Sequence, residues 1–503
     1  MPSVPRYRGS GSPRKHGGVA TWGCPPVGEA LPSDLENKLQ TPSRPGIYSA
    51  MTGGPQGGDA SHIPRKASRE GRHLPWAALL RRWYSLLLFA ILAAFLPEGV
   101  GAQYRLEWHV DGTVQGQYDD NINLSATDPE ADFITTLSPG GQLLIETKTG
   151  RAFLDYHLNA VFYASNPILN YLGHQANLDA HQMLTKDLTF RLKDRFIRSD
   201  EPREVSAQEA PPDGGPQATE FLIGTRLQRS PYIRNNLNPY LEWRYGKDDI
   251  LRVGYRNEIY RNDEDPARDS SRDTYSIGMD HWFGPKYGVG LKLDYLKAQF
   301  NTSSDFDGQD GLATFTRRLD PHTSVFLQTG ISNRNFADET TDYRVYKPSG
   351  GVEHAFSPIV SGRLRAGYFF LVPEHGQDDG GLEGEASITV RWLHLLGTAY
   401  IRAGSTESYL DAENLGFAKY WATGGAVRYQ ATKMVSLGLD ASLSSYDFPS
   451  GQQRTTWHAK TDVSAVLLKW LTGSVEFFHQ EQEGEGTSGY TNNRITFRLT
   501  ARY

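Results

Sequence analysis

The sequence predicts an all-β chain that forms a transmembrane antiparallel up-and-down β-barrel of about 18–20 strands, preceded by a cleaved signal peptide. Three observations support this fold class. Apolar and polar residues alternate with a period of two along most of the chain, connections alternate between short turns and long loops, and the last strand ends on an aromatic residue.

The composition excludes several other classes of protein. Hydrophobic residues make up 38% of the 503 residues, which is too few for a polytopic helical membrane protein. Aromatic residues reach 12% and there are 51 glycines, which argues against a disordered acidic polymer. The single cysteine, Cys24, rules out a disulfide framework or a cysteine-based metal site in the rest of the chain. A net charge of −6 gives no electrostatic case for nucleic acid as a partner.

The first hundred residues predict an export signal. Residues 1–80 are mostly rich in Pro, Gly, Ser and Arg and indicate a disordered extension, so the natural start of translation is expected to lie later in the chain. Residues 81–102 then combine a basic start, an apolar core of roughly 14 residues and small residues up to Ala102, as a cleaved signal peptide does. A membrane anchor is the competing interpretation, but this core is shorter than the roughly 20 residues that a spanning helix needs. Residues 103–503 are therefore expected to form the mature barrel.

Period-two alternation identifies the strands of this region. In Val435–Leu443, apolar residues occupy every second position and Ser436, Gly438, Asp440 and Ser442 lie between them. The same pattern recurs in Leu106–Tyr118, Leu154–Phe162, Leu188–Arg195, Leu241–Tyr245, Leu251–Ile259, Val289–Tyr295, Leu364–Phe370, Ala386–Trp392, Trp457–Leu467 and Ile495–Tyr503. Convincing helical periodicity is absent, so few helices are expected.

The connections indicate a barrel with two different ends. Short turns occur near residues 148–150, 185–187, 246–249, 320–322, 357–358 and 431–433, and longer acidic or Gly-rich links lie between them. Ser199–Ala218 is the longest link and is the segment most expected to fold inward. A soluble propeller or sandwich would also have many short strands, but it would need apolar residues that face a shared core.

The C-terminal strand favours a membrane barrel over these soluble alternatives. Ile495, Phe497, Leu499, Ala501 and Tyr503 share one face, and the chain stops on the aromatic residue. This pattern resembles the terminal strand by which outer-membrane barrels are recognised for assembly. The resemblance makes Phe497 and Tyr503 the expected assembly signal and the barrel assembly machinery an expected partner.

The first hairpin resembles a particular family. Tyr118-Asp119-Asp120-Asn121-Ile122 follows the first strand, and Asp132-Phe133-Ile134 and Ser138-Pro139-Gly140 lead into the second. These motifs are similar to those of the β-barrel porin family found with exopolysaccharide biosynthesis loci in Gram-negative bacteria (beta-barrel porin 2, PEP-CTERM-associated type). The resemblance implies an outer-membrane location and a role in exopolysaccharide export, with lipopolysaccharide, exopolysaccharide and periplasmic export proteins as partners.

The candidate lumen residues lie on the polar face of the predicted strands. They are Glu107, Asp111, Glu242, Arg244, Arg252, Arg256, Glu258, Arg363, Arg365, Arg494, Arg498 and Arg502. Asp155, His157, Arg191, Lys193 and Arg195 share the same parity. Two interpretations remain open: a charged conduit wall with a surplus of basic residues that attracts anions, or paired charges that fill and rigidify the lumen.

We expect no enzymatic activity, cofactor or metal from the sequence. Asp155 and His157 share a face and His109 is expected nearby, but no Ser or Cys stands in a nucleophile motif. Two functions therefore remain: a porin-like conduit for exopolysaccharide, or a structural or adhesive barrel with a plugged lumen. At the closing seam, we expect Arg494, Arg498 and Arg502 to lie alongside Glu107, His109 and Asp111.

Overall fold

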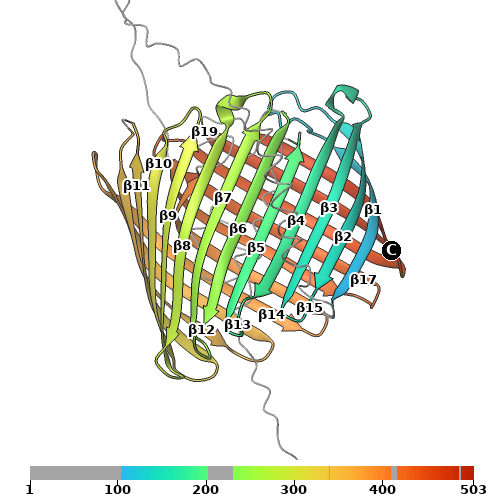
Figure 1. Cartoon of the computed structure of the whole chain (residues 1–503). Coiled ribbons are helices and arrows are strands. Elements are labelled where there is room, and N and C mark those ends of the chain that lie inside the picture. The colour runs from blue at the N-terminus through green and yellow to red at the C-terminus, as the bar shows by residue number, and fades with distance from the viewer. Residues whose placement is uncertain (1–103, 202–229, 339, 409–415, 486–488) are drawn as a thin grey trace, which may run out of the picture.

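A computed structural model of the chain describes residues 104–201, 230–338, 340–408, 416–485 and 489–503, and these form one closed sheet of 20 strands (Figure 1). The strands are β1 (Arg105–Asp119), β2 (Asp132–Glu146), β3 (Gly150–Tyr163), β4 (Tyr171–Met183), β5 (Leu188–Ser199), β6 (Tyr232–Arg244), β7 (Ile250–Asn262), β8 (Ser270–Trp282), β9 (Tyr287–Phe300), β10 (Phe306–Arg318), β11 (Thr323–Phe336), β12 (Tyr343–Ala355), β13 (Val360–Pro373), β14 (Asp379–Trp392), β15 (Leu395–Ser408), β16 (Gly416–Gln430), β17 (Val435–Asp447), β18 (Gln453–Leu468), β19 (Leu471–Glu485) and β20 (Tyr490–Arg502).

The strands follow a simple meander. Each strand pairs antiparallel with its neighbours in chain order, and β1 also pairs with β20, which closes the sheet. The prediction of an antiparallel barrel of about 18–20 strands is therefore confirmed. Closure leaves the sheet without an unpaired edge along most of its height.

The two ends of the barrel differ as the sequence predicts. Short turns such as those at 147–149 and 431–434 gather at one end, called here the turn end (Figure 1). The other end, called here the loop end, carries the longer connections, including the 3₁₀ turns η1 (Pro167–Leu169) and η2 (Pro266–Arg268). Within the described ranges there is no helix long and apolar enough to span a membrane.

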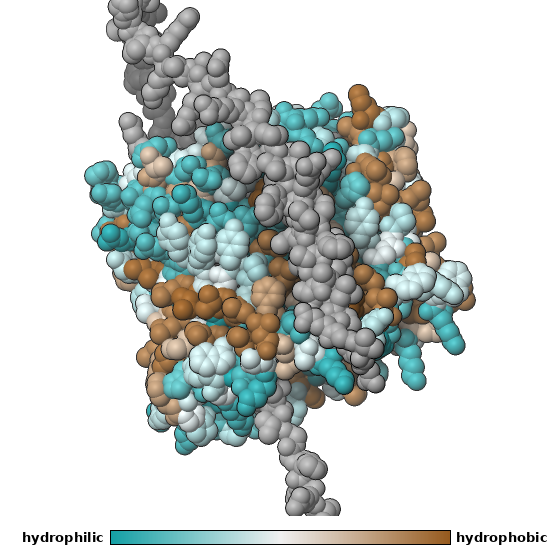
Figure 2. Space-filling model, in the orientation of Figure 1, coloured by the Kyte–Doolittle hydropathy of each residue, from teal (hydrophilic) through white to brown (hydrophobic). Residues whose placement is uncertain are grey.

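The alternation of the sequence becomes an apolar exterior and a polar interior. Trp108, Leu327 and Leu439 are 66%, 67% and 59% exposed, whereas Glu242 and Arg334 are 5% and 3% exposed. This arrangement is the reverse of a soluble protein, in which large apolar side chains are the buried ones. On the face in view, Figure 2 shows hydrophobic side chains across the middle of the wall and mostly hydrophilic ones towards the upper left.

The wall is taller than an apolar membrane band. Strands contain 12 to 16 residues, which corresponds to a height of about 30–40 Å at ~3.3 Å per residue and a tilt of about 40°. An outer-membrane apolar band is about 25 Å tall. The excess includes the loop end of β7 and β8, where the outward-facing Asp273 accepts hydrogen bonds from the Tyr255 hydroxyl (2.6 Å) and the Asn257 amide (2.7 Å). Polar outward side chains at this level indicate that the loop end projects beyond the apolar band.

Candidate functional site: the charged lumen and its inward-folded hairpin

The inward face of β6–β8 is built from interlocked ion pairs. The Glu242 carboxylate accepts hydrogen bonds from Arg244 (3.0 Å) on its own strand and from Arg252 (3.2 Å) on the neighbouring strand. Arg252 also lies 3.7 Å from Asp280 on β8. The register explains this contact, because Glu242 stands directly opposite Arg252. Glu242 is 5% exposed, so its charge depends on these partners.

The predicted lumen residue Glu258 also pairs with a cross-strand neighbour. It forms an ion pair with Arg272, which stands opposite it on β8. Sequence reasoning had selected Glu258 but not its partner. A cross-strand partner appears only when the register is known, so no local pattern could identify Arg272.

The same is true of the two predicted arginines on β13. Arg363 lies 2.9 Å from Glu353, and Arg365 lies 2.6 Å from Glu383. Both carboxylates come from the adjacent strands β12 and β14. Four of the predicted lumen arginines, Arg244, Arg252, Arg363 and Arg365, therefore have carboxylate partners, and the surplus of positive charge in the lumen is smaller than the sequence suggests.

Three predicted lumen arginines, Arg256, Arg498 and Arg502, have no carboxylate within 4 Å among the described residues. Arg498 donates two hydrogen bonds to the neutral Gln115 amide oxygen (3.0 and 3.1 Å). The Arg494 guanidinium lies 4.2 Å from the centre of the Phe478 ring. Arg256 stands opposite Thr274, and Arg502 stands opposite Asp111 but forms no ion pair with it.

The closing seam differs from the expected arrangement. Asp111 does lie opposite Arg502, but Arg498 lies opposite Gln115 and Arg494 opposite Asp119. The expected placement of Arg494 and Arg498 beside the start of β1 is wrong, because β1 extends beyond the end of β20. Its residues Glu107 and His109 consequently face only β2 across the ladder, and Glu107 bonds to Arg105.

Hydrogen bonds, some of them between a charged and a neutral side chain, join the seam. The hydroxyls of Thr113 and Thr500 are 2.9 Å apart. Val110 and Tyr503 exchange backbone hydrogen bonds of 3.2 and 2.9 Å, so the terminal aromatic residue belongs to the ladder. Its ring is 92% exposed, and Phe497 is 55% exposed on the outward face.

A hairpin at the loop end leaves the wall and folds into the lumen. The pairing of β14 with β15 ends at Gly384 opposite Ala403, and the pairing of β16 with β17 begins only at Lys419. Residues 404–408 and 416–418 still pair with each other. This inward-folded segment, called here the tip, is thus detached from both neighbouring strands of the wall.

Buried ion pairs attach the tip to the inward face of β10 and β11. Glu407 bonds to Arg334 of β11 (2.6 Å to Nη2) and accepts a hydrogen bond from the Tyr343 hydroxyl (3.0 Å). Arg334 also donates two hydrogen bonds to Asp310 of β10 (3.0 and 3.2 Å). The guanidinium is 3% exposed and is flanked by two carboxylates, so it acts as a central anchor.

Aromatic packing reinforces this attachment. Phe417 of the tip is buried against Val345 and Phe369, and its ring centre lies 6.1 Å from that of Phe369 and 5.9 Å from that of Tyr343. Lys347 donates a hydrogen bond to the Ser405 carbonyl (3.2 Å). The tip is therefore a folded part of the lumen and narrows it. The link Ser199–Ala218, which was expected to fold inward, lies almost wholly outside the described residues.

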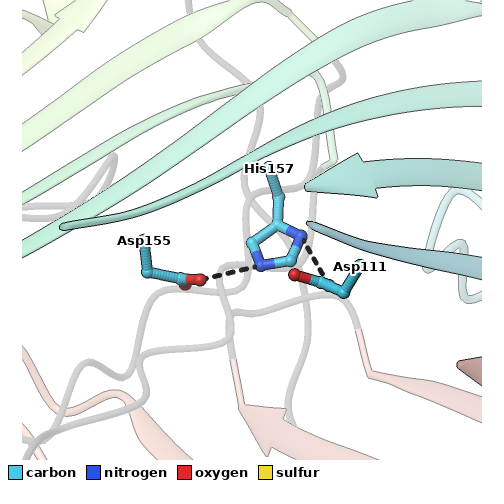
Figure 3. Close-up of side chains that lie close together, drawn as sticks. All are labelled: Asp111, Asp155 and His157. Carbon is cyan, nitrogen blue, oxygen red and sulfur yellow. Dashed lines mark hydrogen bonds and ion pairs between the residues drawn. The ribbon is translucent and has the colours of Figure 1, made fainter. Parts of the chain in front are cut away.

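A separate cluster occupies the inward face of β1 and β3. Asp111, Asp155 and His157 point towards one another, with the imidazole between the two carboxylates (Figure 3). His157 Nε2 lies 3.1 Å from Asp155 Oδ1, and Nδ1 lies 3.7 Å from Asp111 Oδ2. The sequence had indicated that Asp155 and His157 share a face, but it had suggested His109 rather than Asp111 as their neighbour.

Comparisons with known proteins find similarity to solved structures only, and at low identity. No protein-family model matches the sequence, and no curated protein matches it. Among solved structures, the chain is similar to a ferric enterobactin receptor (PfeA) of Pseudomonas aeruginosa, with 10% identity, coverage of 81% of this chain and 82% of that chain, and a TM-score of 0.46. It is also similar to the outer membrane protein OpdK of Pseudomonas aeruginosa, with 8% identity, coverage of 79% and 99%, and a TM-score of 0.39. A third is OccAB3 of Acinetobacter baumannii, with 11% identity, coverage of 79% and 99%, and a TM-score of 0.37.

Proposed function

We propose that this chain is an outer-membrane conduit of a Gram-negative bacterium that takes part in exopolysaccharide export. The observation that carries the conduit proposal is the contrast between the two faces of the wall. Large apolar side chains face outward, and charged side chains from most of the strands face inward. A lipid-facing exterior suits a membrane, and a charged interior is stable where its charges are paired or hydrated, as in a water-filled lumen.

The tip adds a second property to this conduit. A fixed inward segment reduces the cross-section at the loop end, so passage would be selective for size and charge at that level. The flanking Arg334, Asp310 and Glu407 are engaged with one another, which makes them structural supports of the constriction. Exopolysaccharide as the cargo is supported by the sequence resemblance of the first hairpin.

Conductance of the purified protein in a planar bilayer tests the conduit proposal. We expect discrete channels that soluble acidic and neutral polysaccharides block when they are added from one side. Deleting the gene should then reduce the exopolysaccharide released into the medium, and complementation should restore it. Stable channels that no polysaccharide blocks, together with unchanged release, would contradict the cargo but leave the conduit.

The tip also favours a second candidate, a structural or adhesive barrel with a closed lumen. Its packing is dense enough to act as part of a plug, since Phe417 and Ala418 are 7% and 0% exposed. The same bilayer experiment separates the two functions. A protein that inserts correctly and shows no conductance would support the structural barrel and contradict the conduit.

A further inference from the structure

We propose that Asp111 and His157, oriented by Asp155, form a binding site for a divalent transition-metal cation such as Zn²⁺ in the lumen wall. The three side chains come from β1 and β3, which are separated by β2. Their ligand atoms nevertheless all lie within 4.8 Å of one another (Figure 3). This inference does not depend on which solute the barrel passes.

Gly140 of β2 makes the convergence possible. It stands opposite Asp111 on one side and opposite His157 on the other. A Cβ atom at this position would overlap Nδ1 and Cε1 of the imidazole. Because Gly140 has no side chain, the His157 ring can lie across β2 towards Asp111.

The two imidazole nitrogens have different surroundings. The Nε2 distance to Asp155 Oδ1, 3.1 Å, is that of a hydrogen bond, in which Nε2–H donates to the carboxylate. This bond leaves Nδ1 with its lone pair, as in the carboxylate–histidine–metal arrangement of many metal sites. Asp155 is therefore a positioning residue that fixes the ring and its tautomer.

The Nδ1 atom faces a carboxylate at a distance too long for a hydrogen bond. It lies 3.7 Å from Asp111 Oδ2. Zinc binds imidazole nitrogen at ~2.0–2.1 Å and carboxylate oxygen at ~2.0–2.2 Å, so two ligand atoms of one tetrahedral ion lie roughly 3.3 Å apart. A small rotation of either side chain brings the pair to that separation.

Asp111 supplies an independent indication of a ligand. Its side chain is 4% exposed, and Oδ1 is buried with no hydrogen-bond partner in the described part of the structure. A buried carboxylate oxygen is costly when it has no partner. A cation held between Asp111 and Nδ1 would compensate this charge.

The donor set selects the class of cation. One imidazole and carboxylate oxygens suit Zn²⁺, Fe²⁺, Co²⁺ or Ni²⁺, whereas Ca²⁺ prefers six to eight oxygen ligands. Only two protein atoms bind directly, so the remaining positions would be filled by water or by oxygen atoms of a solute in the lumen. An open coordination sphere is typical of exchangeable sites and not of structural ones.

A second histidine provides a matched control. His458 Nε2 lies 2.8 Å from Asp440, but its Nδ1 lies 2.9 Å from the Ser442 hydroxyl. Both nitrogens are thus satisfied by hydrogen bonds, and among the described residues no second carboxylate forms an ion pair with the ring. The geometry predicts that this otherwise similar pair does not bind the cation.

The test is a Zn²⁺ titration of the folded protein, in which Cys24→Ser removes the only thiol from any chain that keeps the segment before Gln103. We expect one tight site by calorimetry, which is lost in Asp111→Asn and in His157→Gln. Asp155→Asn should weaken binding by about 10- to 100-fold, the usual effect of removing an orienting carboxylate. His458→Gln should bind like the parent protein, and heat-modifiable migration on gels should show that each variant remains a folded barrel.

A second measurement uses the parent protein, so that the proposal can be tested even if a variant fails to fold. X-ray absorption of the Zn²⁺-loaded parent protein should show a shell with one imidazole and otherwise oxygen ligands. An all-oxygen shell, several imidazoles, or tight binding that persists in both Asp111→Asn and His157→Gln would overturn the proposal. Absence of binding by the parent protein would also overturn it.

Discussion

The attachment of the tip can be tested by the substitution Glu407→Gln. This change keeps the shape of the side chain but removes the charge that faces Arg334 at 2.6 Å. Arg334 is 3% exposed and, within the described ranges, would keep only Asp310 as a charged partner. Breaking a buried ion pair costs about 3–5 kcal/mol, and we take the lower value because one carboxylate remains.

A loss of about 3 kcal/mol would shift the equilibrium between attached and detached tip by roughly 100-fold, since 1.4 kcal/mol corresponds to a factor of ten. Phe417→Ala should act in the same direction, because truncating a buried phenylalanine costs about 3–5 kcal/mol. Both variants should therefore show larger or fluctuating single-channel conductance in a planar bilayer. The parent protein should show a steady level.

Glu353→Gln is the matched control. It removes the carboxylate that lies 2.9 Å from Arg363, but this pair joins β12 to β13 and does not touch the tip. Its conductance fluctuations should equal those of the parent protein. If Glu407→Gln and Phe417→Ala also behave like the parent, then the tip does not control the width of the lumen, and the reasoning fails.

Three further predictions follow from the wall and its ends. Deleting Tyr503 removes two backbone hydrogen bonds to Val110 and the terminal aromatic ring, and it should deplete the protein from isolated outer membranes; normal levels would refute an assembly role. Arg256→Glu with Arg498→Glu reverses two charges that have no carboxylate within 4 Å among the described residues. The double variant should shift the reversal potential in a salt gradient towards cation selectivity. An unchanged reversal potential would mean that these side chains do not face the conducting path. N-terminal sequencing of the mature protein should begin at Gln103, and an earlier residue would argue against cleavage at this bond.

The sequence predicted the fold well because its main signal is local. A strand that separates lipid from water must alternate at every second residue, and Val435–Leu443 shows the result: Leu439 is 59% exposed outward, while Asp440 bonds to His458 inside. The placement of short turns at one end and longer loops at the other follows from the same meander. These features need no knowledge of contacts between distant strands.

The features that the sequence did not predict are those set by register and by tertiary packing. The partner of Glu258 could not be identified, because Arg272 becomes its neighbour only through the pairing of β7 with β8. The seam was misplaced because the stagger between first and last strands is a property of the whole barrel. Sequence reasoning missed the tip because residues 404–408 look like the continuation of an ordinary strand. The hairpin lies inward because of tertiary contacts, among them those with Arg334 and Phe369.

The seam has a consequence for the order of assembly. Thr113 and Thr500, whose hydroxyls meet across it, are 387 residues apart in the chain. Every other pair of neighbouring strands is joined by a connection and can form as the chain is delivered, whereas this pair must wait for the last residues. Until then, the outer edge of β1 presents a row of unpaired N–H and C=O groups, which are prone to pair with any available strand. The growing barrel therefore requires something to occupy that edge throughout its folding and to release it only when β20 arrives.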